Sequence, residues 1–180
     1  MFDAAAYRIR RRRRVNGIGY EVLEDGDVIL AWTRRTADLA ADFELTTPDG
    51  EPVLRVTIDN LVPDVTAAFT VVDGREGGVL GLIKRDWGSI VRREFELVDR
   101  YDLAFAHVRS KSRLLHIARN QFIKLVPYWY EITDPEGRPI GSIKGGFRGG
   151  CSLELCDTEA LDQRMAVGTA VAVDAVEMLV

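Results

Sequence analysis

The chain has 180 residues, of which 47% are hydrophobic and 29% are charged, and its formal net charge is −4 at pH 7. This length suits one domain with a full core, and the composition excludes an intrinsically disordered chain. Only two cysteines are present, which excludes a disulfide-rich secreted scaffold, and the two histidines lack the spacing of a zinc site. No apolar segment of a signal peptide follows the first charges, so we expect a cytoplasmic protein.

The first feature along the chain is the run RIRRRRR, from Arg8 to Arg14. Without its six arginines the rest of the chain has a formal charge of −10. We expect residues 1–16 to form a basic arm or a first edge segment. Three roles are open for it: a solvated arm, a contact with a lipid surface, or a contact with nucleic acid. Nucleic acid is the least favoured, because no aromatic residue interleaves with the arginines beyond Tyr7.

Five similar segments follow. Each has an aromatic residue, an apolar residue two positions later, a polar turn rich in Asp, Gly or Pro, and then an alternating apolar strand. This is the pattern of a β-hairpin. The starting residues are 23, 26, 26 and 35 positions apart, and this near-regular spacing indicates a repeated unit. The five starting aromatic residues are Tyr20, Phe43, Phe69, Phe95 and Tyr130.

Two further strands are predicted, SRLLHI over residues 112–117 and CSLELC over residues 151–156. About twelve short antiparallel strands favour a closed barrel or a sandwich, because closure removes exposed strand edges. We therefore expect one domain over residues 17–180. Cys151 and Cys156 are an odd number of residues apart, which places them on opposite faces of a strand and disfavours a disulfide. His107 and His116 are interpreted as ordinary sheet residues.

The segment from Met165 to Val180 is apolar nearly all the way round. It is shorter than the about 20 residues of a membrane-spanning helix, and it contains Asp174 and Glu177. We therefore expect a helix buried in the barrel, whose lumen would otherwise be too wide for its own side chains to fill. The β-branched Val171 and Val173 leave a strand as the alternative. The predicted core residues are Met165, Val167, Gly168, Val171, Ala172 and Val176.

The repeated hairpins, followed by LDQRMAVGTAVAVDAVEM, resemble the Tubby C-terminal-like superfamily, and most closely its LURP-one-related and phospholipid scramblase branch. The resemblance implies a twelve-stranded barrel around a central C-terminal hydrophobic helix. In scramblases a proposed calcium segment precedes the helix. The corresponding DTEALD lacks the pattern of a calcium loop, so we interpret Asp157 and Asp162 as helix caps and expect no metal site.

No motif for catalysis or for a cofactor is present, so we expect a protein that is not an enzyme. Basic residues beside aromatic ones, in the loops that follow the second strands of the hairpins, suit an anionic phospholipid surface at the inner face of the membrane. The resemblance points the same way, because Tubby domains bind phosphoinositides through basic barrel residues. The candidate headgroup residues are Arg10, Arg11, Arg12, Arg13, Arg14, Lys84, Arg85, Trp87, Lys111, Arg113, Lys144, Phe147 and Arg148.

Other interpretations stay open at this point. Trp87 and Phe147 would cap the core if the surrounding charges were merely solvated. A protein-interaction scaffold without a lipid ligand is the main functional alternative. A lipid scramblase is less favoured, because it would need the terminal helix in the bilayer.

Overall fold

The structure is a computed structural model. It describes residues 2–14, 17–24, 28–33, 43–59, 68–86, 94–111, 127–146 and 149–179. The strands are β1 (Ala6–Arg14), β2 (Gly17–Glu24), β3 (Val28–Thr33), β4 (Phe43–Thr46), β5 (Pro52–Asp59), β6 (Ala68–Asp73), β7 (Val79–Asp86), β8 (Glu94–Val98), β9 (Ala104–Ser110), β10 (Trp129–Thr133), β11 (Pro139–Gly145) and β12 (Cys151–Leu155). They are followed by helix α2 (Gln163–Leu179).

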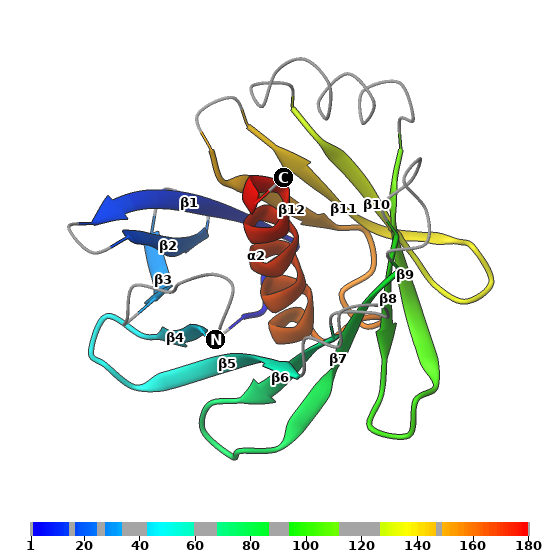
Figure 1. The fold of residues 1–180 in the computed structure, drawn as a ribbon, viewed down its shortest axis with the longest axis horizontal. Helices are drawn as coiled ribbons and strands as arrows, with labels where there is room; N and C mark the ends of the chain where they lie inside the picture. Colours follow the sequence, from blue (N-terminus) through cyan, green and yellow to red (C-terminus); the bar gives the residue numbers. More distant parts are fainter. Residues whose placement is uncertain are drawn as a thin grey trace.

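The twelve strands form a closed antiparallel barrel in which sequence neighbours are also neighbours in space, and β1 pairs with β12 to close the ring. Helix α2 stands inside the ring of strands (Figure 1). The fold class predicted from the sequence is therefore confirmed. Because neighbouring strands alternate in direction, the odd-numbered strands all finish at one end of the barrel, here called the odd-strand end. The described turns that join an even-numbered strand to the next odd-numbered strand lie at the opposite end, here called the hairpin-turn end.

The five repeated aromatic residues occupy equivalent places in five hairpins, as predicted. Each lies in an even-numbered strand that pairs antiparallel with the next strand along the chain. All five rings point into the core and are at most 5% exposed. Gly50 and Gly137 each occupy the fourth place of a tight turn with positive φ angles of 92° and 83°, a conformation that suits glycine. In these two hairpins the aromatic residue marks the side chain that faces the core and the glycine marks the turn.

Residues 1–16 were expected to form a basic arm or a first edge segment, and in the structure the run of arginines belongs to β1, a strand of the barrel wall. Residues 6–9 pair with β12 and residues 8–14 pair with β2. Tyr7 and Ile9 are buried, whereas Arg8 points outward. The apolar partners that alternate with the first arginines therefore place this segment in the sheet. The predicted strand over residues 112–117 and His116 lie outside the described residues, whereas CSLELC forms β12.

Helix α2 fills the lumen. Its residues from Met165 to Glu177 are buried, including all six of the predicted core residues. A Cβ atom at Gly168 would lie 3.0 Å from Leu54 Cδ2 and 3.3 Å from Val71 Cγ1, so the wall approaches the helix backbone closely at this glycine. Within the described ranges, no helix combines the length and the apolar character needed to cross a bilayer.

The two expected caps have different roles. Asp162 immediately precedes α2, and its Oδ1 accepts a hydrogen bond of 2.8 Å from the backbone N–H of Arg164, as an N-cap does. Asp157 lies earlier and instead caps a turn, where its Oδ1 accepts bonds from the N–H groups of Glu159 and Ala160. Cys151 is buried and Cys156 is exposed, and both are free thiols, in agreement with the prediction that they are not paired.

Candidate functional site

The basic residues predicted to contact lipid do not all face the same way. Arg11 and Arg85 point into the barrel, where Arg11 reaches Asp174 on α2 and Arg85 is buried. Lys84 is on the outside, but its Nζ bonds to Asp102 in the β8–β9 turn at the hairpin-turn end. These residues therefore do not combine into one basic surface.

On β1, the outward-facing Arg10 and Arg12 both lie beside the carboxylate of Glu21 on β2, with N–O distances of 3.9 and 2.9 Å. Arg13 and Arg14 also belong to β1, but their side chains lie outside the described part of the chain. Four more candidates lie wholly outside the described residues: Trp87, Arg113, Phe147 and Arg148. Among the described candidates, Lys111 and Lys144 come from different segments of the sequence and lie on either side of one aromatic ring.

These two lysines flank an aromatic residue that the sequence analysis did not single out. Trp129, the first residue of β10, is 39% exposed on the outside of the barrel. The Nζ atom of Lys111 lies 4.3 Å from the centre of the indole ring, and that of Lys144 lies 5.7 Å from it. Such cation–π contacts contribute about 0.5–1 kcal/mol each at exposed sites.

The strand register explains why the three side chains meet. Trp129 pairs with Lys144 on β11, and the N–H of Lys111, just after β9, donates to the carbonyl of Trp129. The same lateral row continues from Lys144 to Ser152 on β12 and then to Arg8 on β1. We call these five residues the Trp129 row. It crosses five neighbouring strands on the outer face and reaches the odd-strand end at Lys111, Trp129 and Lys144.

A second lateral row lies one residue pair farther from the odd-strand end and contains two carboxylates. Glu131 follows Trp129 by two residues on β10, and Glu154 follows Ser152 by two residues on β12. Glu131 Oε1 lies 3.4 Å from Lys111 Nζ, and Glu154 Oε2 lies 2.7 Å from Lys144 Nζ. All four charged side chains are between 38% and 51% exposed, so these are surface ion pairs. Such pairs contribute about 0–1 kcal/mol and exchange readily.

The interior of the odd-strand end holds a different cluster, centred on Asp174 of α2. Arg11 donates to Asp174 Oδ2 from Nε at 3.2 Å and from Nη2 at 2.5 Å. The hydroxyl of Tyr20 donates to the same oxygen at 2.8 Å, and that of Tyr128 donates to Oδ1 at 2.6 Å. Four donors thus satisfy a carboxylate that is completely buried, as a buried charge requires. We call Asp174, Arg11, Tyr20 and Tyr128 the Asp174 network.

Burial is the largest single influence on the pKa values of Tyr20, Tyr128 and Arg11 in this network. It raises the pKa of the Tyr20 and Tyr128 hydroxyls, and the nearby Asp174 carboxylate adds to this effect. For Arg11, burial favours loss of the proton, but Asp174 outweighs it and the pKa of the guanidinium is raised. Burial also raises the pKa of the Cys151 thiol, which keeps it protonated at neutral pH. The Tyr20 and Tyr128 hydroxyls, the Arg11 guanidinium and the Cys151 thiol therefore keep their protons at neutral pH.

Glycines in the β11–β12 segment allow the backbone to cover this network. A Cβ atom at Gly145 would lie 2.2 Å from the Tyr128 ring, and one at Gly149 would lie 2.9 Å from Arg11 Nη1. Nearby, the hydroxyl of Tyr130 donates to Glu177 at 2.6 Å. Both acidic residues inside the helix sequence are thus bonded to the wall of the barrel.

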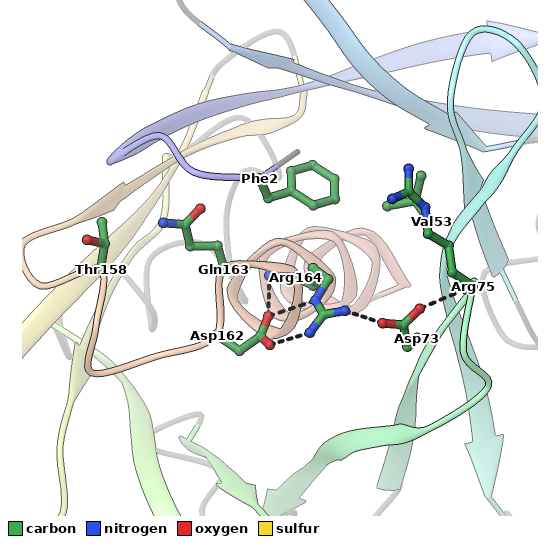
Figure 2. Close-up of a pocket in the computed structure, with 8 residues that line it drawn as sticks. All are labelled: Phe2, Val53, Asp73, Arg75, Thr158, Asp162, Gln163 and Arg164. Carbon is green, nitrogen blue, oxygen red and sulfur yellow. Dashed lines mark hydrogen bonds and ion pairs between the residues drawn. The ribbon is translucent and has the colours of Figure 1, made fainter.

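A pocket of about 400 Å³ opens at the hairpin-turn end, beside the first turn of α2 (Figure 2). Arg164 spans it, bonding to Asp162 through Nη2 at 2.8 Å and to Asp73 through Nη1. Asp73 also accepts backbone N–H bonds from the β6–β7 turn, at Arg75 and Glu76. Desolvation alone would raise the pKa of Asp73, but these bonds and Arg164 lower it. The arrangement links the helix to the wall. The pocket is lined by Phe2, Val53, Asp73, Arg75, Thr158, Asp162, Gln163 and Arg164.

The sequence contained a signal for Trp129 that was not used. Tyr130 was predicted to lie in a hairpin strand. Because side chains alternate across a strand, a core position for this aromatic residue makes its neighbour Trp129 point outward. Asp174 was noticed only as a charge that argues against a membrane helix. Its partner Arg11 is 163 residues away, a distance that no local pattern spans. Among the described residues, no cluster of His, Cys, Asp or Glu is suited to hold a metal ion.

Comparison with known proteins finds no family model that matches this chain, and no curated protein and no solved structure that is significantly similar to it.

Proposed function

We propose that this barrel binds anionic phospholipid surfaces peripherally, with the Trp129 row as the contact. The observation that carries the proposal is an exposed tryptophan with a lysine on each side at the odd-strand end. Tryptophan is favoured at the interface between headgroups and acyl chains, because there its apolar ring contacts the acyl chains while its N–H stays hydrated. Lysine beside it supplies a mobile ammonium group that meets the phosphates.

The magnitudes are compatible with such an exchange. A Lys or Arg near an anionic membrane contributes about 1 kcal/mol, and this attraction falls off within the Debye length of about 8–10 Å. The ion pairs that Lys111 and Lys144 would give up contribute no more than about 1 kcal/mol each. A strongly anionic surface is therefore able to replace the glutamates as partners of these lysines.

The acidic charge of the body does not prevent this orientation. Among the described residues, most exposed acidic side chains lie in the turns at the hairpin-turn end and in the segment before α2. Glu154, the partner of Lys144, is an exception. This separation of charge among the described residues favours an orientation in which the odd-strand end faces a negative surface. The exposed acids in these turns and in that segment are Asp49, Glu51, Glu76, Asp102, Glu136, Asp157, Glu159 and Asp162.

Sedimentation with vesicles that contain phosphatidylserine tests the proposal. We expect Trp129→Ala to weaken binding without changing its salt dependence, because the residue has no charge. We expect Lys111→Gln and Lys144→Gln each to weaken binding about fivefold and to make it less sensitive to salt. Tyr101→Ala is the matched control, since Tyr101 is 68% exposed and lies under Arg100 at 4.8 Å, but at the hairpin-turn end. An equal loss in Tyr101→Ala and Trp129→Ala would contradict the proposed contact.

A protein-interaction scaffold is the second candidate, and a specific observation favours it. Tyr101 and Leu103 in the β8–β9 turn are 68% and 66% exposed, among acidic residues that suit a basic protein more than an anionic membrane. No binding of the wild-type chain to anionic vesicles at low salt would leave this candidate in front. The scramblase alternative receives no support from the position of α2, which is buried inside the barrel.

Two further expectations belong to the same proposal. The architecture is the one that the Tubby C-terminal-like resemblance implies, and we propose membership of that superfamily on this basis together with the hairpin repeat. We also propose that the protein acts at the cytoplasmic face, where anionic lipids are concentrated.

A further inference from the structure

Each lysine of the Trp129 row has a dedicated carboxylate. Lys111 is paired with Glu131 and Lys144 with Glu154, and in both cases the glutamate lies on a neighbouring strand and on the same outer face. The carboxylates stand two residues deeper along their strands than the row itself, a separation of about 7 Å. They therefore hold the lysine side chains back from the odd-strand end.

We propose that Glu131 and Glu154 are specificity-determining residues that restrict the Trp129 row to strongly anionic surfaces. The inference rests on the proposed lipid function. Each glutamate competes with lipid phosphate for its lysine. Each also lies within the Debye length of a membrane in contact with the row, so that the surface repels it. Binding then requires enough anionic lipid to overcome both effects.

The geometry makes this competition direct. A lysine Nζ within 2.7–3.4 Å of a glutamate oxygen has to rotate away before it meets a phosphate beyond the end of its strand. The indole of Trp129 lies between the two ammonium groups and contacts both, so it is able to hold each lysine in either position. Two states of each lysine, paired inward or facing the lipid, follow from these contacts.

The test compares Glu131→Gln/Glu154→Gln with the wild-type chain. Binding is measured on phosphatidylcholine vesicles that contain increasing fractions of phosphatidylserine. We expect each exchange to tighten binding about fivefold, the factor that corresponds to about 1 kcal/mol per charge at the surface. The double variant should therefore bind at serine-lipid fractions at which the wild type stays in solution. Both glutamates are half-exposed, so the fold should tolerate glutamine, which circular dichroism checks.

The chain offers a matched control in Glu136, which is exposed and lies 3.3 Å from its own ion-pair partner Arg138, but in the β10–β11 turn at the hairpin-turn end. Glu136→Gln changes the net charge by the same amount as either single exchange. We expect it to bind like the wild type. If Glu136→Gln tightens binding as much as Glu131→Gln or Glu154→Gln, net charge alone explains the effect and the competition is refuted.

The remaining outcomes separate this inference from the proposed function. If the double variant and the wild type bind equally well, the competition is refuted but the lipid function is kept. Binding by the double variant at a phosphatidylserine fraction at which the wild type stays in solution, together with wild-type binding at higher fractions, supports the competition. If neither chain binds vesicles made entirely of anionic lipid, the lipid function fails and the inference fails with it.

Discussion

The Asp174 network and the Trp129 row are built from the same kinds of side chains, yet they are suited to opposite tasks. The Asp174 network combines a cation, a carboxylate and aromatic residues, and so does the Trp129 row together with its partners Glu131 and Glu154. Both lie toward the odd-strand end of the barrel. Asp174 is completely buried, whereas Glu131 and Glu154 are 38% and 51% exposed. Charge interactions are much stronger in the interior, where no water replaces a lost partner. The comparison shows that burial makes the ion pair of Asp174 a permanent structural contact, whereas the exposed lysines are able to exchange their glutamate partners for others.

The two clusters meet at consecutive residues. Tyr128 bonds to Asp174 inside the barrel, and Trp129 stands on the outside between its lysines. One step along a strand is enough to move a side chain from the core to the surface. A membrane contact at Trp129 would therefore lie directly beside the segment that holds the helix.

The largest expected loss of stability comes from removing the carboxylate of the Asp174 network. Asp174→Ala leaves the Arg11 guanidinium and two tyrosine hydroxyls without their acceptor in the interior. Removing one partner of a buried ion pair costs about 3–5 kcal/mol, a large part of the about 5–15 kcal/mol that stabilises a typical domain. Urea unfolding followed by circular dichroism measures the loss.

The surface counterpart serves as the control for that experiment. Lys144→Gln removes a cation from an exposed pair, and we expect the free energy of unfolding to change by less than about 1 kcal/mol. Equal losses in Asp174→Ala and Lys144→Gln would mean that burial does not distinguish the two clusters.

A smaller loss is expected from the apolar part of the same helix. Gly168→Leu forces a side chain into contact with Leu54 and Val71, whose atoms already lie 3.0 and 3.3 Å from the position of a Cβ. Overpacking of this kind costs about 1–3 kcal/mol, or more where the wall does not yield. Thermal unfolding should show a lower Tm for Gly168→Leu and a smaller decrease for Gly168→Ala. A Tm for Gly168→Leu equal to that of the wild type would show that the lumen has spare volume there.

The ion pairs of Arg164 lie between the two extremes, because Asp73 is nearly buried while Arg164 is partly exposed. Desolvation raises the pKa values of Asp73 and Asp162, but hydrogen bonds and Arg164 outweigh it, and both are lowered from the ordinary value of 3.8. A carboxyl with a lowered pKa stabilises the fold above its ordinary pKa, and this stabilisation is lost as the pH falls through the folded-state value. We therefore expect Tm to fall on acidification below about pH 4, and less steeply in Asp73→Asn. Parallel Tm curves for the two proteins would contradict the assignment.

Local sequence patterns predicted most of the fold but only part of the candidate site. The hairpin repeat predicted equivalent strand positions for Tyr20, Phe43, Phe69, Phe95 and Tyr130, because period-2 alternation and turn residues are short-range signals. The arginine run concealed the same alternation, since Arg11 points inward and Arg10 and Arg12 point outward although all three are the same residue type. The sequence alone therefore assigned Arg11 to the same surface as its neighbours. Only closure of the barrel brings the first strand beside the last helix.

The central claim is that Trp129 enters an anionic membrane surface while the Asp174 network stays intact. The chain has three tryptophans, so Trp32→Phe/Trp87→Phe leaves Trp129 as the only tryptophan. Its fluorescence should shift to the blue on addition of phosphatidylserine vesicles and should be quenched by brominated lipid, with no change in the far-ultraviolet circular dichroism. An emission spectrum that anionic vesicles leave unchanged, at a lipid concentration at which the chain sediments with them, would place the contact elsewhere and contradict the account.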